Sequence, residues 1–426
     1  MNLIDGQRMD SQKSQEILPH LEERLARTLE SGRLSPSVVI GACDRLVHTL
    51  EEERYLRLME QMGIGRTLGT EYLRTAKQLF SREYLETRLR RELGEACLEA
   101  RRYTPPDRPA GVTERRLPLG VLLHIAAGNA DALPAFTVLE GLLPGNINLL
   151  KLPEAEGGAS ILLLEELLRA EPSLIPYVYV FDYSSKDVKS MARLIQAADA
   201  VVVWGGDAAV SALRRLVGPD TRLIEWGHKV SFAYVTARGW EEGQLDGLAA
   251  HLCATDQLLC SSCQGIYLDT DQPERLEDFC RRFLPVLERH AGAKEDSLGL
   301  RSQVSLQLYT EELEQPYKGS RLFRGRRCSL LAYPDSRLEP SLQFRNCWVR
   351  PLPHGRIVET LRPYKNHLQT VGLLCGPEER EALADRFWRT GVVRVTSGAE
   401  MSATYCGAAH DGEYALQRYT KLASLE

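Results

Sequence analysis

Two cysteines, Cys260 and Cys263, stand three positions apart in the stretch DQLLCSSCQG, and their spacing fits several kinds of chemistry. A C-x-x-C redox pair is typical of a strand-to-helix turn, whereas here an apolar run typical of a strand follows the pair. A zinc site would need two further ligands, and no second pair stands at metal spacing. The thiols could also fill a core, because free cysteine is among the most buried residue types.

The remaining interpretation of this stretch is a nucleophile. Cys260 would react as the thiolate, and nearby N–H donors would stabilise that charge. Spacing alone leaves all of these interpretations open.

Several polar residues stand next to or inside predicted strands. Asn129 lies between a predicted buried strand and a predicted helix. It could cap the helix, or its side-chain amide could donate to an oxyanion that forms during a reaction. Glu225 is the last residue of the predicted strand LIE. It could be a solvated carboxylate or a general base. Lys151 and Glu154 flank another strand-to-helix junction, where surface charges are ordinary. His124 lies inside an apolar strand, and we expect it to be a hydrogen-bonded core histidine.

The elements that must position these residues begin with a helical segment. Between about residues 10 and 100, apolar residues recur at spacings of three and four and charges fill the other face. Ser35 before Pro36 predicts a helix start, with serine as the cap and proline in the first turn. A break, YTPPDRPAG, follows at residues 103–111.

After the break, short apolar strands alternate with longer helices, which is typical of βαβ units in a parallel sheet covered on both faces. The sequence therefore predicts an α/β, doubly wound fold. We expect a helical segment at 1–111, a Rossmann-like nucleotide-binding domain at 112–235, a second α/β domain at 236–404 that carries Cys260, and a tail at 405–426.

Ligands of such sheets bind at the carboxyl ends of the strands, where helix N-termini offer free N–H groups. Three junctions meet this description, and they read HIAAGNAD, KLPEAEGG and WGGDAAV, the last containing Gly205 and Gly206. None is a G-x-G-x-x-G fingerprint, so a nucleotide-binding domain and a generic α/β enzyme both remain open.

Composition narrows the class of protein. Hydrophobic residues make up 43% and charged residues 26%, values typical of globular proteins. The net charge of −5 gives no general attraction for nucleic acid, although an anionic ligand could use a basic cluster such as RLFRGRRC. No apolar run is long enough to span a membrane, and the N-terminus lacks the pattern of a signal peptide. We expect a cytoplasmic protein whose ten cysteines are mostly thiols.

Several segments together resemble a known superfamily. PLGVLLHIAAGNADALP, NINLLKLPE and IEWGHK resemble, in order, the entry strand, the ribose-binding junction and the glutamate strand of aldehyde dehydrogenases. DQLLCSSCQGIYL, with its D-Q-x-x-C-x-S-x-Q spacing, and the ending HDGEYALQRYT resemble the LuxC-type acyl-CoA reductases more closely.

The resemblance implies a role for each matching residue. Cys260 would be the acyl-accepting nucleophile and Asn129 the oxyanion donor. Lys151 and Glu154 would hold the adenosine ribose of NAD(P)H, and a carboxylate at Glu154 favours NADH over NADPH because it would repel a 2′-phosphate. In the same way, Gly205 and Gly206 would let the cofactor approach the next helix.

The implied reaction is the reduction of an acyl-CoA to an aldehyde. The thiolate of Cys260 takes the acyl group, CoA leaves, and hydride from the nicotinamide then releases the aldehyde, with no metal required. Glu225 stands where ordinary aldehyde dehydrogenases have a water-activating base, so a CoA-independent aldehyde dehydrogenase is the alternative. No counterpart of the E-x-F-G-P segment that holds the nicotinamide ribose is present.

The resemblance also implies partners. An acyl-protein synthetase could deliver acyl groups, and the chain could instead be an acyl-carrying subunit of a multi-enzyme fatty acid reductase. EYALQRYTK resembles the superfamily's subunit-contacting tail, which predicts a homodimer or homotetramer. Cys263 would be a bystander whose position raises two possibilities, capture of the acyl group or a disulfide with Cys260.

Overall fold

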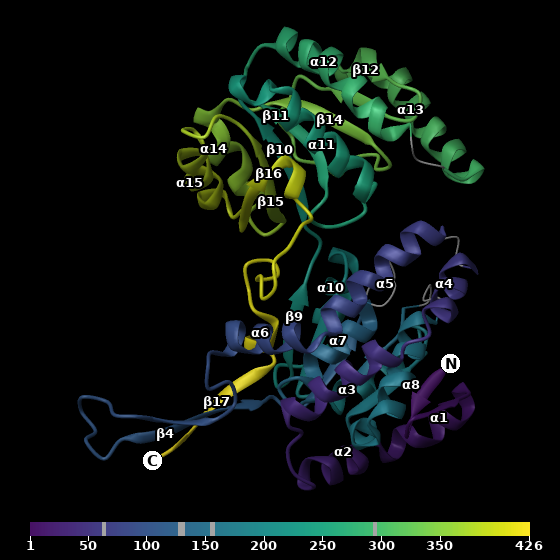
Figure 1. Cartoon of the computed structure of the whole chain (residues 1–426), viewed down its shortest axis with the longest axis vertical. Coiled ribbons are helices and arrows are strands. Elements are labelled where there is room, and N and C mark those ends of the chain that lie inside the picture. The colour runs from purple at the N-terminus through teal and green to yellow at the C-terminus, as the bar shows by residue number, and fades with distance from the viewer. Residues whose placement is uncertain (62–64, 127–132, 154–157, 293–295) are drawn as a thin grey trace. The chain divides into compact units, whose positions relative to one another are not determined.

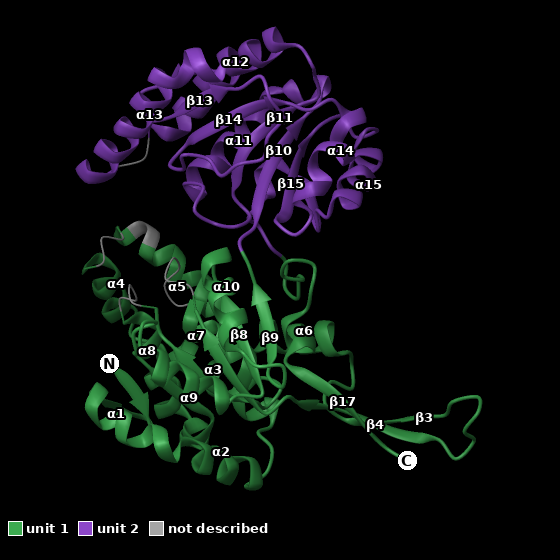
Figure 2. Ribbon diagram, turned by 180° about the vertical axis from the view of Figure 1, so that it is seen from behind, with its two compact units in different colours: residues 1–227, 405–426 green, residues 228–404 purple. Residues whose placement is uncertain are grey.

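The structure is a computed structural model that describes residues 1–61, 65–126, 133–153, 158–292 and 296–426 (Figure 1). The chain forms two compact units (Figure 2). Unit 1 contains Met1–Gly227 and Tyr405–Glu426, and unit 2 contains His228–Thr404. The boundaries expected at residues 111, 235 and 404 remain a proposal about domain organisation.

The first part of unit 1 contains the helical segment that the sequence predicts. Its helices are α1 (Ser11–Ile17), η1 (Leu18–His20), α2 (Leu21–Glu30), α3 (Pro36–Thr49), α4 (Glu52–Gln61), α5 (Arg66–Phe80) and α6 (Arg82–Leu93). The predicted start of α3 is confirmed, because the Ser35 hydroxyl accepts from the backbone N–H of Ser37 and Pro36 takes the first helical position.

The centre of unit 1 is a seven-stranded sheet in the order β2-β1-β7-β6-β5-β8-β9. Its parallel strands are β5 (Val121–Ile125), β6 (Ile147–Lys151), β7 (Val178–Phe181), β8 (Ala200–Trp204) and β9 (Arg222–Trp226). Chain order therefore reverses between β5 and β8, the switch point at which doubly wound sheets bind ligands. The strand β1 (Asn2–Ile4) pairs antiparallel with β7 and with the edge strand β2 (Gln7–Met9), and neither β1 nor β2 was predicted.

Helices cover both faces of this sheet, as the predicted βαβ alternation requires. The buried side chains of α7 (Leu133–Leu142) and α8 (Ala159–Ala170) join one core with those of α3 and α6. Those of α9 (Val188–Gln196) and α10 (Asp207–Leu216) join a second core with α2. His124 lies in β5 with no exposed surface and bonds to the Asn148 side chain at 2.9 Å, so the expected core histidine is confirmed.

The C-terminal segment returns to unit 1. There β17 (Thr420–Leu425) pairs with β4 (Val112–Pro118), which pairs with β3 (Ala100–Tyr103), and this small sheet extends away from the helices of the unit (Figure 2). The short helix α16 (Ala415–Arg418) is fixed to α6, because the Leu416 N–H donates to the Glu92 carboxylate at 2.8 Å and the Gln417 amide to the Glu92 carbonyl at 2.6 Å.

Unit 2 is a second α/β sheet, in the order β12-β13-β14-β11-β10-β15-β16. All of its strands are parallel except the edge strand β12. The strands are β10 (Val230–Val235), β11 (Cys263–Leu268), β12 (Arg321–Arg324), β13 (Ser329–Ala332), β14 (Asn346–Pro351), β15 (Leu368–Leu374) and β16 (Arg394–Ser397).

Helices again cover both faces of the sheet. One face packs against α11 (Glu242–Thr255) and α12 (Pro273–Ala291), and the other against α14 (Ile357–Leu361) and α15 (Arg380–Thr390). The predicted α/β fold, with a doubly wound sheet in the first unit and a second α/β unit after it, is therefore confirmed. No helix in the described ranges combines the length and apolar character needed to cross a bilayer.

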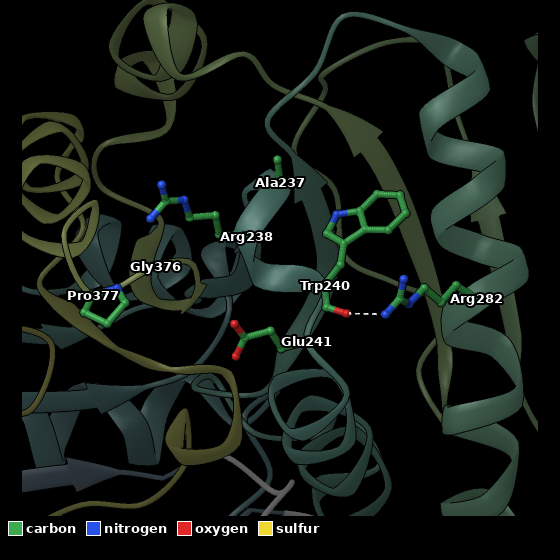
Figure 3. Close-up of a pocket in the computed structure, with 7 residues that line it drawn as sticks. All are labelled: Ala237, Arg238, Trp240, Glu241, Arg282, Gly376 and Pro377. Atoms are coloured by element: carbon green, nitrogen blue, oxygen red, sulfur yellow. Dashed lines mark hydrogen bonds between the residues drawn. The ribbon is translucent and has the colours of Figure 1, made fainter.

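A pocket of about 310 Å³ lies at the carboxyl ends of β10 and β15 (Figure 3). Its two guanidinium groups are engaged, Arg238 by the Glu378 carboxylate and Arg282 by the Trp240 carbonyl at 2.8 Å. Cys260 lies at the opposite end of the sheet, before the amino end of β11, and does not line this pocket.

Candidate active site

Cys260 lies in the loop between α11 and β11, and its side chain is exposed. Its sulfur accepts a hydrogen bond from the side-chain amide of Gln369, with Nε2 at 3.2 Å from Sγ. Gln369 lies near the amino end of β15 and is only 6% exposed. An N–H donor bonds more strongly to a thiolate than to a thiol, so this contact favours the reactive form of cysteine.

The backbone of Cys260 is held against the central strands. Its carbonyl accepts from the Ser231 hydroxyl of β10 at 2.7 Å, and the same hydroxyl accepts from the Thr370 N–H of β15 at 3.1 Å. Three segments distant in the sequence therefore meet at the thiol. This geometry gives an exposed nucleophile on a fixed backbone.

The residues that precede Cys260 hold the loop in an unusual backbone conformation. Asp256 and Gln257 both have positive φ, 46° and 63°, in the left-handed region that costs free energy for residues other than glycine. The Asp256 carbonyl accepts from the Phe344 N–H at 2.9 Å, and its carboxylate pairs with buried Arg345. The Gln257 side chain is fully buried and donates to the Cys263 carbonyl at 2.9 Å.

The residues after Cys260 complete this framework. Ser262 accepts from the Leu259 N–H at 3.0 Å, and the Gln264 amide donates to the Gln257 carbonyl at 2.8 Å. A Cβ at Gly265 would fall on the ring of Trp348, so only glycine fits there. The D-Q-x-x-C-x-S-x-Q spacing thus encodes the hydrogen bonds that shape the loop.

Cys263 differs from Cys260 in burial. It has no exposed surface, its thiol donates to the Gly265 carbonyl at 3.2 Å, and its N–H donates to Nε2 of His251 at 3.2 Å. Burial lowers the pKa of His251 to about 4, with a smaller contribution from Arg394, so the ring is neutral and able to accept. Cys263 therefore packs as a core residue.

The other thiols of this region are also buried. Burial raises the pKa of Cys347, with Cys263 as the next contribution, and burial raises the pKa of Cys328 to about 12. The ten cysteines, all among the described residues, form no disulfide, and Cys260 is the exposed one among them.

The predicted cofactor residues lie at one edge of the unit 1 sheet. Lys151 ends β6, is 4% exposed, and donates to the Ser185 hydroxyl at 3.3 Å. Gly205 follows β8, and Gly206 caps α10 with open space where a Cβ would stand. β5 lies between β6 and β8, so these residues flank the switch point.

Glu225 belongs to the same unit and is held by a guanidinium. Both of its carboxylate oxygens accept from Arg214, each at 2.5 Å. The hydrogen bond to Glu225 raises the pKa of Arg214. The pair leaves neither carboxylate oxygen of Glu225 without a guanidinium partner.

Aromatic rings pack beside Glu225. Trp204 and Trp226 stack with centroids 5.3 Å apart, and His410 of the H-D-G motif lies 5.0 and 5.1 Å from them. Arg418 of the L-Q-R motif covers Trp226 at 4.7 Å and donates to the Glu225 carbonyl at 3.2 Å. These C-terminal motifs therefore support the ends of β8 and β9.

Two predicted site residues, Asn129 and Glu154, lie outside the described residues. Cys260 belongs to unit 2, whereas Lys151, Glu225 and the two glycines belong to unit 1. In the described ranges, no group of three or more histidine, cysteine or acidic side chains could hold a metal ion. The prediction missed Gln369, since a glutamine near the start of an apolar strand, HLQTVG, carries no signal of function.

A comparison with protein families gives a match over most of the sequence. The family model described as acyl-CoA reductase (LuxC) matches residues 34–422. The chain belongs to the LuxC family. The resemblance noted from the Cys260 stretch is therefore confirmed.

Relatives of this LuxC chain are named long-chain acyl-protein thioester reductases. The protein from Aliivibrio fischeri is 24% identical over 321 residues, which cover 72% of this chain and 64% of that protein. The protein from Vibrio harveyi is 24% identical over 334 residues, which cover 73% of this chain and 65% of that protein. The LuxC chain thus spans less than two thirds of the length of these relatives.

Solved structures similar to this LuxC chain share the aldehyde dehydrogenase fold. One is AldA of P. syringae, an indole-3-acetaldehyde dehydrogenase solved with NAD⁺. Its TM-score is 0.70 at 14% identity, and the match covers 100% of this chain and 95% of the AldA chain. An NAD-dependent benzaldehyde dehydrogenase from Corynebacterium glutamicum has a TM-score of 0.68 at 12% identity. The match covers 96% of this chain and 88% of the benzaldehyde dehydrogenase chain. At this identity the likeness shows the fold alone.

Proposed function

We propose that the chain is an NAD(P)H-dependent reductase that converts a fatty or other acyl-CoA thioester to the aldehyde through a thioacyl-enzyme on Cys260. The single observation that carries this proposal is an exposed thiol with a buried amide donor on its sulfur, in a loop fixed from both sides. The description of the family as acyl-CoA reductases supports the choice of substrate.

The proposed reaction begins with attack by the Cys260 thiolate on the thioester carbonyl. Gln369 holds the sulfur before attack, and Asn129 is the predicted donor to the oxyanion that forms. The oxyanion collapses, the bond to the CoA sulfur breaks, and the acyl group remains on Cys260. A bound reduced nicotinamide would supply hydride to this acyl group. Collapse of the second tetrahedral intermediate breaks the bond to the Cys260 sulfur, which leaves as a thiolate.

Unit 1 fits a nicotinamide dinucleotide. Buried Lys151 places a positive charge at the carboxyl end of β6, and Gly206 leaves open space at the start of α10, both beside the switch point. Lys151, Gly205 and Gly206 would hold the cofactor, with Glu154 at the ribose as the basis of a preference for NADH.

The Arg214–Glu225 pair favours a reductase over the alternative, a CoA-independent aldehyde dehydrogenase. That alternative needs Glu225 to activate water against the thioacyl group. With both carboxylate oxygens engaged by Arg214, the base is occupied and hydrolysis is slowed. We retain Glu225 as a proposed site residue whose activity depends on release from Arg214.

Partners and assembly complete the proposal. Because the relatives are named for acyl-protein thioesters, a thioester on a protein such as an acyl-protein synthetase is a second proposed acyl donor. The strand β17 follows the L-Q-R motif and is largely exposed, so we propose the sheet β3-β4-β17 as a contact in a homodimer or homotetramer.

Product analysis tests the proposal. The chain is incubated with a panel of acyl-CoAs and with NADH or NADPH, and aldehyde, carboxylic acid and free CoA are measured. Aldehyde and CoA in equal amounts, lost in Cys260→Ala, are expected. Oxidation of aldehydes without CoA, together with no reduction of any acyl-CoA, would support the dehydrogenase instead.

A further inference from the structure

The basic stretch RLFRGRRC forms a tight hairpin at the edge of unit 2. Strands β12 and β13 pair antiparallel, and the Gly325 N–H donates to the Cys328 carbonyl at 2.9 Å to close the turn. A Cβ at Gly325 would lie 2.9 Å from the Cys328 sulfur, so the tight turn favours glycine. The hairpin therefore carries Arg324, Arg326 and Arg327 within four positions of one another.

These arginines line a pocket of about 170 Å³, which we name the arginine pocket. Arg301, in the first turns of α13 (Leu298–Lys318), and Arg345, which precedes β14, complete its basic lining. One acidic residue, Asp296, lines it as well. The positive groups therefore come from three separate segments and converge on one cavity.

The charges of the pocket are not balanced within the described part of the chain. Arg345 is 2% exposed and pairs with the carboxylates of Asp256 and Asp296. No described carboxylate lies within ion-pair distance of the guanidinium groups of Arg301, Arg324 and Arg326. Three like charges around a cavity repel one another unless an anion occupies it, and guanidinium forks suit phosphate.

The pocket is joined to the loop of Cys260 by direct bonds. Nε of Arg345 donates to the Arg327 carbonyl at 3.2 Å, and Nη1 of Arg345 pairs with Asp256, four positions before Cys260. The same buried guanidinium therefore fixes the hairpin and the nucleophile loop.

The sheet sets the separation between pocket and thiol. β13, β14 and β11 are adjacent and parallel, so their amino ends share one edge of the sheet. The pocket precedes β13 and β14, whereas the Cys260 sulfur is bonded by Gln369 at the amino end of β15. β15 lies three strands from β14 and four from β13, and at about 4.8 Å per spacing this is roughly 14–19 Å. An extended pantetheine arm is of similar length and can bridge it.

We propose that the arginine pocket binds the phosphate groups of CoA while the thioester lies at Cys260. The inference rests on the proposed function. It places the phosphates of CoA on unit 2. CoA carries a diphosphate and a 3′-phosphate, which match several guanidinium groups, whereas a single carboxylate ligand would use only one or two.

Calorimetric binding of desulfo-CoA, which keeps the phosphates and lacks the thiol, tests the inference directly on the full chain. The double variant Arg324→Ala/Arg326→Ala should bind at least about tenfold more weakly, with a smaller dependence on salt. The control Arg275→Ala removes an exposed arginine outside the pocket and should bind like the wild type. Thermal melting checks that the variants fold.

Equal binding of desulfo-CoA by the double variant and the wild type would overturn the inference, and so would no binding by the wild type. Neither result depends on chemistry at Cys260. If binding depends on the arginines but no acyl group is transferred, the proposed function fails and the CoA site stands.

Kinetics separates CoA from other acyl donors. In the double variant, KM for acyl-CoA should rise at least about tenfold while KM for acyl-pantetheine, which has no phosphate, stays unchanged. A higher KM for both acyl-CoA and acyl-pantetheine, or a higher KM for an acylated protein alone, would show that the pocket does not bind the phosphates of CoA.

Discussion

Gln369 offers a sharp test of the chemistry at Cys260, because its side-chain amide donates directly to the sulfur. Its amide Nε2 lies 3.2 Å from the sulfur, and a hydrogen bond to a charged group contributes about 1.5–3 kcal/mol. Gln369→Leu removes the donor at similar size, so acylation of Cys260 should slow by roughly 10- to 150-fold. Gln369→Glu places an anion beside the thiolate and should slow it at least as much.

Two measurements separate this role from a structural one. Single-turnover acylation by acyl-CoA gives the rate, and alkylation of Cys260 across pH reports the thiolate: the Leu variant should react slowly at neutral pH and recover at high pH. The control is Gln244→Leu, because the Gln244 amide donates to the Cys375 carbonyl at 3.4 Å, beyond the other end of β15. Unchanged acylation and alkylation in Gln369→Leu would refute the reasoning.

Three further predictions follow from other contacts. Gly265→Ala should destabilise unit 2 by about 1–3 kcal/mol or more through overpacking, seen as a lower melting temperature, whereas Gly243→Ala, with open space for its Cβ, should not. Arg214→Ala should release Glu225 and raise the yield of carboxylic acid relative to aldehyde, and an unchanged ratio would exclude Glu225 as the base. Burial lowers the pKa of His124 to about 4, below its ordinary 6.5, so the unfolded chain takes up a proton first as pH falls. The contribution of His124 to the free energy of unfolding should therefore fall by about 3 kcal/mol between pH 6.5 and 4, and His124→Gln should remove that part of the slope in denaturant titrations.

Local patterns predicted most of the elements. The alternation of apolar strands with helices gave the strands from Val121 to Trp226 and the helices between them, because burial on both faces demands continuous apolar runs. Ser35 and Pro36 predicted a helix start through backbone chemistry that acts within a few residues. The strand Asn2–Ile4 was missed because three residues are too few to carry a period.

The contacts of the site could not be predicted in the same way. Cys260 was found because its neighbours have a fixed spacing, but Gln369 reaches it from 109 positions away. Nothing in the sequence distinguishes Arg345 from the other arginines, yet its side chain is buried and pairs with the carboxylates of Asp256 and Asp296. Such bonds arise only when the parallel sheet places the amino ends of distant strands together.

The central claim is that Cys260, and not Cys263, carries the acyl group. Mass spectrometry of peptides after incubation with acyl-CoA, without reductant, measures this directly. We predict one acyl adduct on Cys260 that NAD(P)H discharges as aldehyde, unchanged in Cys263→Ala and absent in Cys260→Ala. An adduct that survives in Cys260→Ala and disappears in Cys263→Ala would contradict the account.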